Sequence, residues 1–218
     1  MRTPSLAAPR VSRVYVAASV LSAATALLPP VATAATRTLW VEALQFLLLA
    51  FGVPVFAALA LPARLRPLRH GQRWMILALV LEAALQIVWR TPTAVDGLAH
   101  HWGLVLLEGA TLAPVGVLLW SFLVAGRSPG AERTVYPWRM SMAAIAMWTT
   151  WMMAYLIGFS GSQWYPAYRG QRGLSVIADQ QLTSGLLWLG SGLAYLPTIF
   201  WCLWQLLAPE RGGSKELV

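Results

Sequence analysis

The sequence predicts an all-α, polytopic membrane protein built as a bundle of transmembrane helices. Of its 218 residues, 58% are hydrophobic and 11% are charged, whereas a soluble domain carries about 25% charged residues. The apolar residues gather in runs close to the roughly 20 residues that a helix needs to cross the hydrocarbon core. The 12 tryptophans suit the headgroup region, which indole side chains favour. A soluble core could not bury this much apolar surface, so lipid must face part of it.

Five apolar runs qualify clearly as spans. The connections between them are short, so consecutive helices must pack antiparallel in an up-and-down bundle. We expect neither an internal repeat nor a soluble domain beside the bundle. In chain order the runs are Leu39–Leu61, Trp74–Trp89, Trp102–Ala125, Met140–Ser160 and Leu182–Leu207.

The N-terminal segment, residues 1–34, has two interpretations. Its apolar run Val14–Leu28 follows three arginines and leads to the small-residue motif Ala32-Thr33-Ala34. This order of basic, apolar and small residues is typical of a secretory signal peptide, which predicts cleavage after Ala34. The alternative is that the run is kept as a sixth, N-terminal transmembrane helix. In either case residues 35–218 form the membrane helical bundle.

Positive residues are divided unevenly between the two ends of the predicted bundle. Twelve of the 16 lysines and arginines lie in the N-terminal segment, the connections Pro62–Arg73 and Gly126–Arg139, and the C-terminal tail. The positive-inside rule therefore places these segments and the C-terminus on the cytoplasmic side of a bacterial inner membrane. The net charge of +8 then reflects topology and not nucleic-acid binding, for which no motif is present. The four remaining positive residues are Arg37, Arg90, Arg169 and Arg172.

Three glutamates, Glu42, Glu82 and Glu108, interrupt the apolar runs. An ionisable residue in a span costs about 2.5 to 3.5 kcal/mol on insertion scales, so each needs a partner or a function. At about 1.5 Å per residue, Glu82 and Glu108 fall at similar depths on consecutive antiparallel helices. Their carboxyl groups could therefore meet, and one of the two would then keep its proton. The alternative is a protonated glutamate that is hydrogen-bonded to a neighbouring helix.

Other polar residues gather at the predicted outer end. Asp179, Gln180 and Gln181 open the last run, and we expect Asp179 to cap its own helix, because an aspartate carboxylate accepts free backbone N–H groups. His100 and His101 are interpreted as solvated interface residues. The sequence contains no GxSxG, phosphate-loop, HExxH or Cys/His metal motif, so enzyme activity is not expected.

Three segments together carry a more specific pattern. In residues, order and spacing they resemble the CtaG family of cytochrome c oxidase assembly factors, over about residues 39–207. The segments are Leu44-Gln45-Phe46-Leu47-Leu48-Leu49, then Leu107-Glu108-Gly109 followed by Gly116 and Trp120, and finally Tyr165-Pro166 with Asp179-Gln180-Gln181, Gly185, Trp188 and Gly192.

The resemblance implies a bundle in the bacterial plasma membrane that handles copper for the buried copper centre of the oxidase. Its expected partners are haem-copper oxidase subunits and the lipid bilayer, and copper is a candidate cofactor. The family has histidine at the positions of Glu42, Phe46 and Gly109. Only Glu42 keeps a donor atom, so it is the one candidate metal ligand, although a hard carboxylate suits Cu(I) poorly. Gly109, with Ala113 and Gly116, also forms a small-residue stripe that favours close helix packing.

The leading hypothesis is a CtaG-like factor for assembly of, or copper insertion into, cytochrome c oxidase, without a strong copper site of its own. One alternative is a structural accessory subunit of a respiratory membrane complex. Another is a small transporter or proton conductor that uses the three glutamates. Besides Glu42, the candidate functional residues are Gln45, Glu82, Glu108, Asp179, Gln180 and Gln181.

Overall fold

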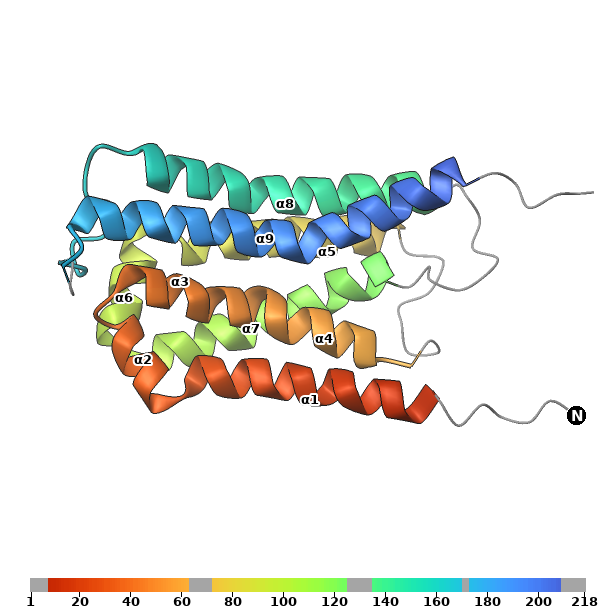
Figure 1. The fold of residues 1–218 in the computed structure, drawn as a ribbon, viewed down its shortest axis with the longest axis horizontal. Coiled ribbons are helices and arrows are strands. Elements are labelled where there is room, and N and C mark those ends of the chain that lie inside the picture. The colour runs from red at the N-terminus through yellow and green to blue at the C-terminus, as the bar shows by residue number, and fades with distance from the viewer. Residues whose placement is uncertain (1–7, 63–71, 125–134, 170–172, 209–218) are drawn as a thin grey trace, which may run out of the picture.

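The computed structural model describes residues 8–62, 72–124, 135–169 and 173–208, and every element in these ranges is a helix. The long helices run side by side as a bundle, which confirms the all-α architecture (Figure 1). The helices are α1 (Ala8–Leu27), α2 (Pro29–Ala35), α3 (Leu39–Leu47), the π-helical η1 (Leu48–Gly52), α4 (Val53–Ala60), α5 (Gln72–Trp89), α6 (Pro92–His100), α7 (Trp102–Val124), α8 (Val135–Phe159) and α9 (Val176–Leu207).

The described helices provide between four and six candidate membrane spans. Four are long and apolar enough by themselves: Leu39–Ala60, which joins α3, η1 and α4, and the helices α7, α8 and α9. Two further candidates are bent pairs of helices. The α1–α2 pair bends by 54° and the α5–α6 pair bends by 65°. The predicted polytopic membrane bundle is therefore confirmed, and the second predicted span is a helix that continues into a bent end.

The short helices α2 and α6 lie at the same end of the bundle (Figure 1). Residues 160–169, which we call the covering segment, follow α8 at that end. We refer to this end as the α2/α6 end. The basic connections and tail that carry the predicted orientation fall largely on residues 63–71, 125–134 and 209–218, outside the described residues, so the orientation stays a prediction.

The first helix packs in the bundle beside α4 and η1 (Figure 1). The Ser19 hydroxyl donates to the carbonyl of Val53 at 3.0 Å, and the Gln45 side chain donates to the carbonyl of Ala26 at 2.7 Å. The run Val14–Leu28 thus forms part of a helix that contacts the spans. Whether this helix is removed from the mature protein stays a prediction.

The span Leu39–Ala60 widens to a π-helical turn just before Pro54. A proline ring excludes the carbonyl four residues earlier and supplies no N–H, and a π turn accommodates both effects. Helix α7 approaches closely here, because a Cβ atom added to Gly116 would lie 2.8 Å from Pro54. A Cβ added to Gly109 would lie 3.4 Å from Leu49. Both glycines of the predicted stripe therefore face this span.

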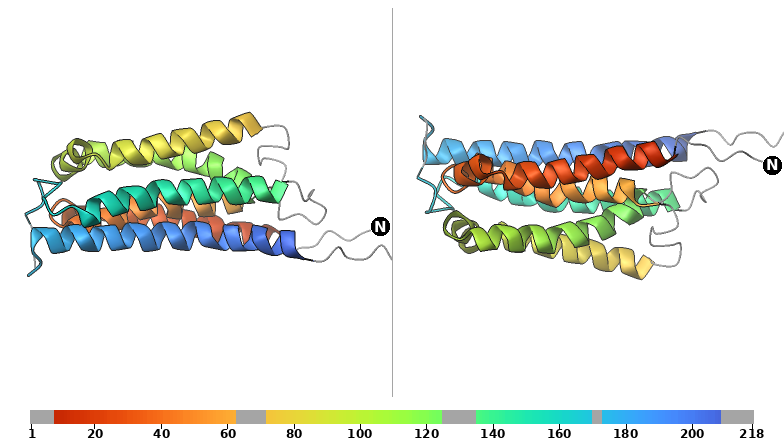
Figure 2. Two further views of the ribbon diagram at one scale, coloured as in Figure 1. Left: turned by 90° about the horizontal axis from the view of Figure 1, so that it is seen from above. Right: turned by 90° about the horizontal axis from the view of Figure 1, so that it is seen from below.

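Helices α8 and α9 pack along much of their lengths, as do α5 and α7 (Figure 2). On α8 and α9 the indoles of Trp151 and Trp188 stack with centroids 5.3 Å apart. Each indole N–H donates to the other residue's backbone carbonyl, at 3.2 and 3.1 Å. Large apolar side chains such as Phe159 and Trp204 are exposed on the outer surface, as expected where a helix faces lipid.

Candidate functional site

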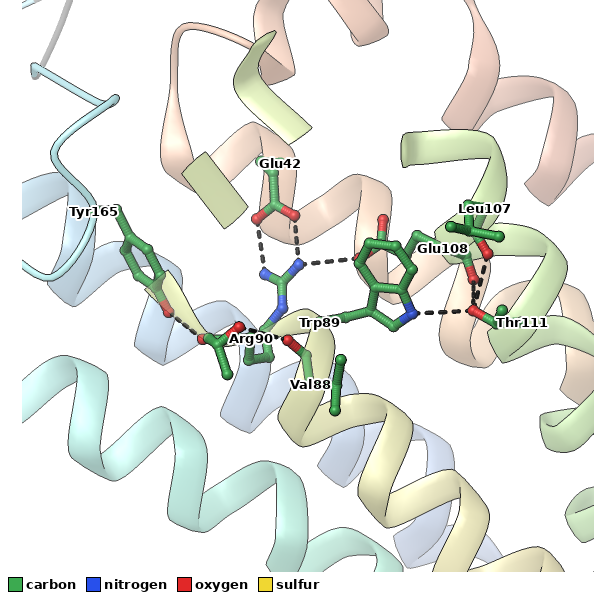
Figure 3. Close-up of polar contacts among 9 residues, drawn as sticks. Glu42, Val88, Trp89, Arg90, Leu107, Glu108, Thr111 and Tyr165 are labelled. Atoms are coloured by element: carbon green, nitrogen blue, oxygen red, sulfur yellow. Dashed lines mark hydrogen bonds and ion pairs between the residues drawn. The ribbon is translucent and has the colours of Figure 1, made fainter. Parts of the chain in front are cut away.

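The polar centre of the α2/α6 end is the buried side chain of Arg90. Its Nη1 donates to Glu42 Oε2 at 2.7 Å, and its Nη2 donates to Glu42 Oε1 at 2.5 Å and to Glu108 Oε1 at 3.2 Å. Figure 3 shows the guanidinium lying between the two carboxylates. Arg90, Glu42 and Glu108 are 2%, 2% and 1% exposed. The three side chains therefore form one ion-paired group inside the protein, which we call the Arg90 cluster.

The bend between α5 and α6 places Arg90 in this cluster. Helix α5 ends at Trp89, and α6 begins at Pro92, where proline suits the first helical turn because it needs no N–H partner. The Trp89 indole N–H donates to Thr111 of α7 at 3.0 Å, next to the cluster in Figure 3. The Arg90 guanidinium lies 4.1 Å from the centre of the Phe46 ring, a cation–π contact. Side chains of α3 and α7 thus hold the Arg90 side chain in place.

The charges of the cluster do not balance as simple pairs. One guanidinium faces two carboxylates, and it binds both oxygens of Glu42 in the two-pronged geometry that suits arginine. An intact buried ion pair adds little net stability. Removing one of its partners is nevertheless strongly destabilising, because the other charge is left buried and uncompensated. The cluster therefore constrains the relative positions of α3, α5 and α7.

The covering segment closes over the cluster. The Tyr165 hydroxyl donates to the backbone carbonyl of Arg90 at 3.0 Å, and the backbone N–H of Ala167 donates to Asp96 of α6 at 3.0 Å. Tyr165 and Tyr168 are both buried. Burial raises the pKa of each of these phenols above the ordinary value. Both tyrosines therefore stay neutral and shield the Arg90 cluster from water.

Asp179 caps a different helix from the one predicted. The N-cap of α9 is Ser175, whose hydroxyl accepts from the N–H of Ala178 at 3.1 Å. The Asp179 carboxylate accepts instead from the N–H groups of Leu39 and Trp40, each at 3.0 Å. These groups open α3, whose own N-cap makes no side-chain hydrogen bond. The expectation that Asp179 caps α9 was wrong, because α3 lies close enough to use the same carboxylate.

The three glutamines among the candidates have different positions. Gln180 is buried, accepts from the N–H of Trp164 at 2.9 Å and donates to the carbonyl of Ile157 at 2.8 Å, so it ties the covering segment to α8 and α9. Gln45 is buried and bonds α1. Gln181 is exposed and lies outside this network. Gln45 and Gln180 therefore each connect separate segments of the chain through hydrogen bonds.

Glu82 and Glu108 have separate partners, which corrects the expectation that their carboxyl groups meet. Glu108 bonds Arg90, whereas Glu82 accepts from the Gln86 amide of its own helix at 3.1 Å. Gln86 in turn accepts from the Thr150 hydroxyl of α8 at 2.6 Å. The carboxylate that shares a cation with Glu108 is Glu42. The sequence-based reasoning counted Arg90 only among the positive residues outside the basic segments and did not consider it as a partner of the glutamates.

A simple count could have identified Arg90 as a buried residue. Two glutamates near the outer ends of their spans need a cation, and Arg90 stands at the end of the intervening span, directly before Thr91 and Pro92. A proline at that position marks a chain that turns and does not simply leave the membrane. The two glutamates and the turn at Pro92 together indicate that the Arg90 side chain points into the bundle.

The donor atoms at this end do not gather as a metal site among the described residues, where no group of three or more His, Cys, Asp or Glu side chains could hold a metal ion. Both oxygens of Glu42 are bonded to Arg90. The Phe46 ring packs against the same guanidinium, and Gly109 has no side chain. The arrangement holds an internal cation, the Arg90 guanidinium, where the resemblance pointed to metal ligands.

A comparison with protein-family models matches residues 2–208 to the cytochrome c oxidase caa3 assembly factor family. The comparison with curated proteins and the comparison with solved structures found no match. The matched region includes α1 and every residue of the Arg90 cluster. The chain is therefore a multi-pass membrane protein that belongs to the cytochrome c oxidase caa3 assembly factor family.

Proposed function

We propose that this protein assists the assembly of a haem-copper oxidase in the bacterial plasma membrane without binding copper tightly itself. The observation that carries the proposal is the placement of the Arg90 guanidinium on Glu42 and Glu108. Its partners are subunits of the oxidase, which it holds during assembly and then releases.

The chemistry of the Arg90 cluster disfavours a metal ion at the same place. Cu(I) prefers thiolate, thioether or imidazole ligands, and the side chains here are two carboxylates, a phenyl ring and a guanidinium. A metal cation would also be repelled by the fixed positive charge of Arg90 at short range. Internal charge compensation, without a metal ion, accounts for how the Arg90 cluster holds α3, α5 and α7 together.

The rest of the α2/α6 end supports a role in holding a partner. The covering segment is fixed by bonds to Arg90, Asp96 and Gln180. This end therefore presents a fixed surface to another protein. Under the predicted orientation the surface faces the periplasm, the side on which the copper-binding domain of the oxidase is expected to receive its metal.

A deletion strain tests the proposal. Loss of the protein should lower the amount of haem-copper oxidase seen in membrane spectra and should lower oxygen uptake by the same factor. A plasmid copy of the unmodified gene should restore both. Normal oxidase spectra and oxygen uptake in the deletion strain, under conditions where the protein is expressed, would contradict the proposal.

Affinity purification separates an assembly factor from the alternative of a structural subunit. The tagged protein should recover incomplete oxidase subunits, and little of it should be present in the finished enzyme. One copy of the protein in each purified mature oxidase would support the subunit interpretation and contradict transient assistance.

A further inference from the structure

Glu82 stands apart from the Arg90 cluster and has a different environment. It is 0% exposed on α5 and lies at the middle of the bundle. Its Oε1 accepts from the neutral amide of Gln86 at 3.1 Å, and its Oε2 has no hydrogen-bond partner. Glu108, which is equally buried, bonds the guanidinium of Arg90. The two buried glutamates therefore form a natural comparison: one faces a cation, and the other faces an amide.

This difference determines the charge that each side chain can carry. A carboxylate in an apolar interior is stable when a cation and hydrogen bonds compensate it, and otherwise the neutral acid is favoured. Arg90 carries one positive charge, and Glu42 and Glu108 already share it. Arg90 also lies about 12 Å along the helix from Glu82, at about 1.5 Å per residue. Glu82 therefore has no cation to compensate a negative charge, and a bound proton can neutralise it instead.

Other unpartnered polar atoms accompany Glu82. The Tyr195 hydroxyl of α9 is fully buried without a hydrogen-bond partner, and it lies near enough to Glu82 and Gln86 for both to act on it electrostatically. The Tyr195 ring stacks on Trp120 of α7 at 4.8 Å, and the Trp120 N–H is also unpartnered. From α8 the polar group that reaches this position is Thr150, which does not titrate and bonds Gln86. Helices α5, α8 and α9 therefore bring polar groups to one buried place, and the Trp120 ring of α7 packs against it.

We propose that Glu82, with Gln86 and Tyr195, forms a proton-binding site in the middle of the bundle. A proton binds Oε2 of Glu82 and gives the neutral acid, and no other covalent bond changes. Gln86 holds the carboxyl group in place through Oε1, because its own carbonyl is fixed by Thr150. Tyr195 of α9 supplies the polar group that faces the acid. Tyr195 is a titratable group that interacts electrostatically with Glu82, whereas Arg90, which follows α5, and Glu108 of α7 belong to the Arg90 cluster.

Infrared spectroscopy of the purified full-length protein tests the site, since a protonated carboxyl group has a C=O band that a carboxylate lacks. At neutral pH we expect an acid-band component that is lost in Glu82→Gln and retained in Glu108→Gln. Glutamine has the shape of the protonated acid and can accept the Gln86 bond, so Glu82→Gln should fold. An acid band unchanged in folded Glu82→Gln would overturn the proposal.

A matched pair of tyrosine variants tests the part played by Tyr195. Tyr195→Phe should shift the Glu82 acid band, whereas Tyr168→Phe, which removes an equally unpartnered buried hydroxyl at the α2/α6 end, should leave it in place. A band that stays fixed in Tyr195→Phe would overturn the inclusion of Tyr195 in the site.

A second measurement uses the unmodified protein in native membranes and so does not depend on the folding of a variant. Dicyclohexylcarbodiimide is an apolar reagent that reacts with protonated carboxyl groups in membrane interiors. Mass spectrometry should locate its stable adduct on Glu82 and not on Glu42, which is bonded to Arg90 through both oxygens. An adduct on Glu42 with Glu82 unmodified would contradict the proposed site.

Discussion

The carboxylate of Asp179 accepts a hydrogen bond from the backbone N–H of Leu39 at 3.0 Å, although 140 positions separate the two residues. Its other oxygen accepts from the N–H of Trp40. A carboxylate at this position satisfies two free N–H groups and lies at the positive end of the α3 dipole. Helix α9 thereby fixes the start of α3, and Glu42, within the first turn of α3, is fixed with it.

The first prediction concerns this cap. Asp179→Ala removes two hydrogen bonds to a charged group, which contribute about 1.5–3 kcal/mol each, and leaves the buried N–H of Leu39 and the partly buried N–H of Trp40 unpaired. We expect the free energy of unfolding to fall by about 3–6 kcal/mol, the sum for the two bonds. Asp179→Asn keeps one acceptor oxygen and should lose less. Thermal unfolding in detergent, followed by circular dichroism, measures both changes.

Gln181→Ala is the matched control for the cap. Gln181 lies two positions after Asp179 on the exposed side of α9, and substitutions at exposed positions usually change stability by less than about 0.5 kcal/mol. Equal losses in Asp179→Ala and Gln181→Ala would show that the contact with α3 does not stabilise the protein.

The second prediction concerns the cation of the Arg90 cluster. Arg90→Met keeps an apolar side chain of similar length but leaves Glu42 and Glu108 without a cation. Loss of one partner from a buried ion pair costs about 3–5 kcal/mol, so we expect a large fall in unfolding temperature. Adding Glu42→Gln to Arg90→Met should recover part of the loss, because one uncompensated charge becomes a neutral amide.

Arg37→Met controls for the removal of positive charge at the same end. Arg37 is exposed in the connection between α2 and α3, so its loss should change stability little. If Arg90→Met proved as stable as Arg37→Met, the ion pairs would make no net contribution to holding α3, α5 and α7 together.

The sequence predicted the bundle well, because apolar runs of span length have few other stable arrangements. It also identified Glu42, Glu108 and Gln180 as residues that need an explanation, since polar groups are costly in a membrane interior. The partners of these residues could not be predicted. Arg90 reaches Glu42 across 48 positions, and the bend of 65° that directs it inward depends on how α6 packs.

Asp179 illustrates the same limit. The residue type and position predicted a helix cap, and capping is what the side chain does. The helix that it caps depends on the approach of α3 to α9, which spacing along the chain does not report. For Glu82, one alternative from the sequence was a glutamate hydrogen-bonded to a neighbouring helix. The structure shows a hydrogen bond, but its partner is Gln86 on the same helix.

The third prediction is that the purified protein does not hold Cu(I) at one equivalent. Phe46→His combined with Gly109→His should increase copper binding, because imidazole is a suitable ligand. A Cβ at residue 109 would make an ordinary contact with Leu49, at 3.4 Å, but an imidazole extends further, so circular dichroism must first show that the variant folds. Elemental analysis of protein loaded under reducing conditions measures the metal. Tight copper in the unmodified protein that is lost in Glu42→Gln would contradict this prediction.

The fourth prediction is that the C-terminus lies in the cytoplasm. Twelve of 16 positive residues belong to the segments on that side, and positive charges resist translocation. A reporter that is active only in the periplasm should therefore stay silent when fused after Val218, and one fused within the covering segment, after Gly161, should be active. The reverse pattern would invert the orientation and place the Arg90 cluster near the cytoplasm.

The last prediction concerns the N-terminal helix, for which the sequence favoured cleavage after Ala34 and left retention as the alternative. The contacts of α1 favour retention. Its Ala26 carbonyl accepts from the buried Gln45 amide at 2.7 Å, and leaving a buried amide without a partner costs about 1–3 kcal/mol. Ala34 itself lies inside α2, whereas a signal peptidase needs an extended segment. Mass spectrometry of the purified protein should therefore find peptides from residues 14–28 at the same abundance as peptides from α9. A mature N-terminus at Ala35 would show that the bundle forms without α1, and Gln45 would then need another partner.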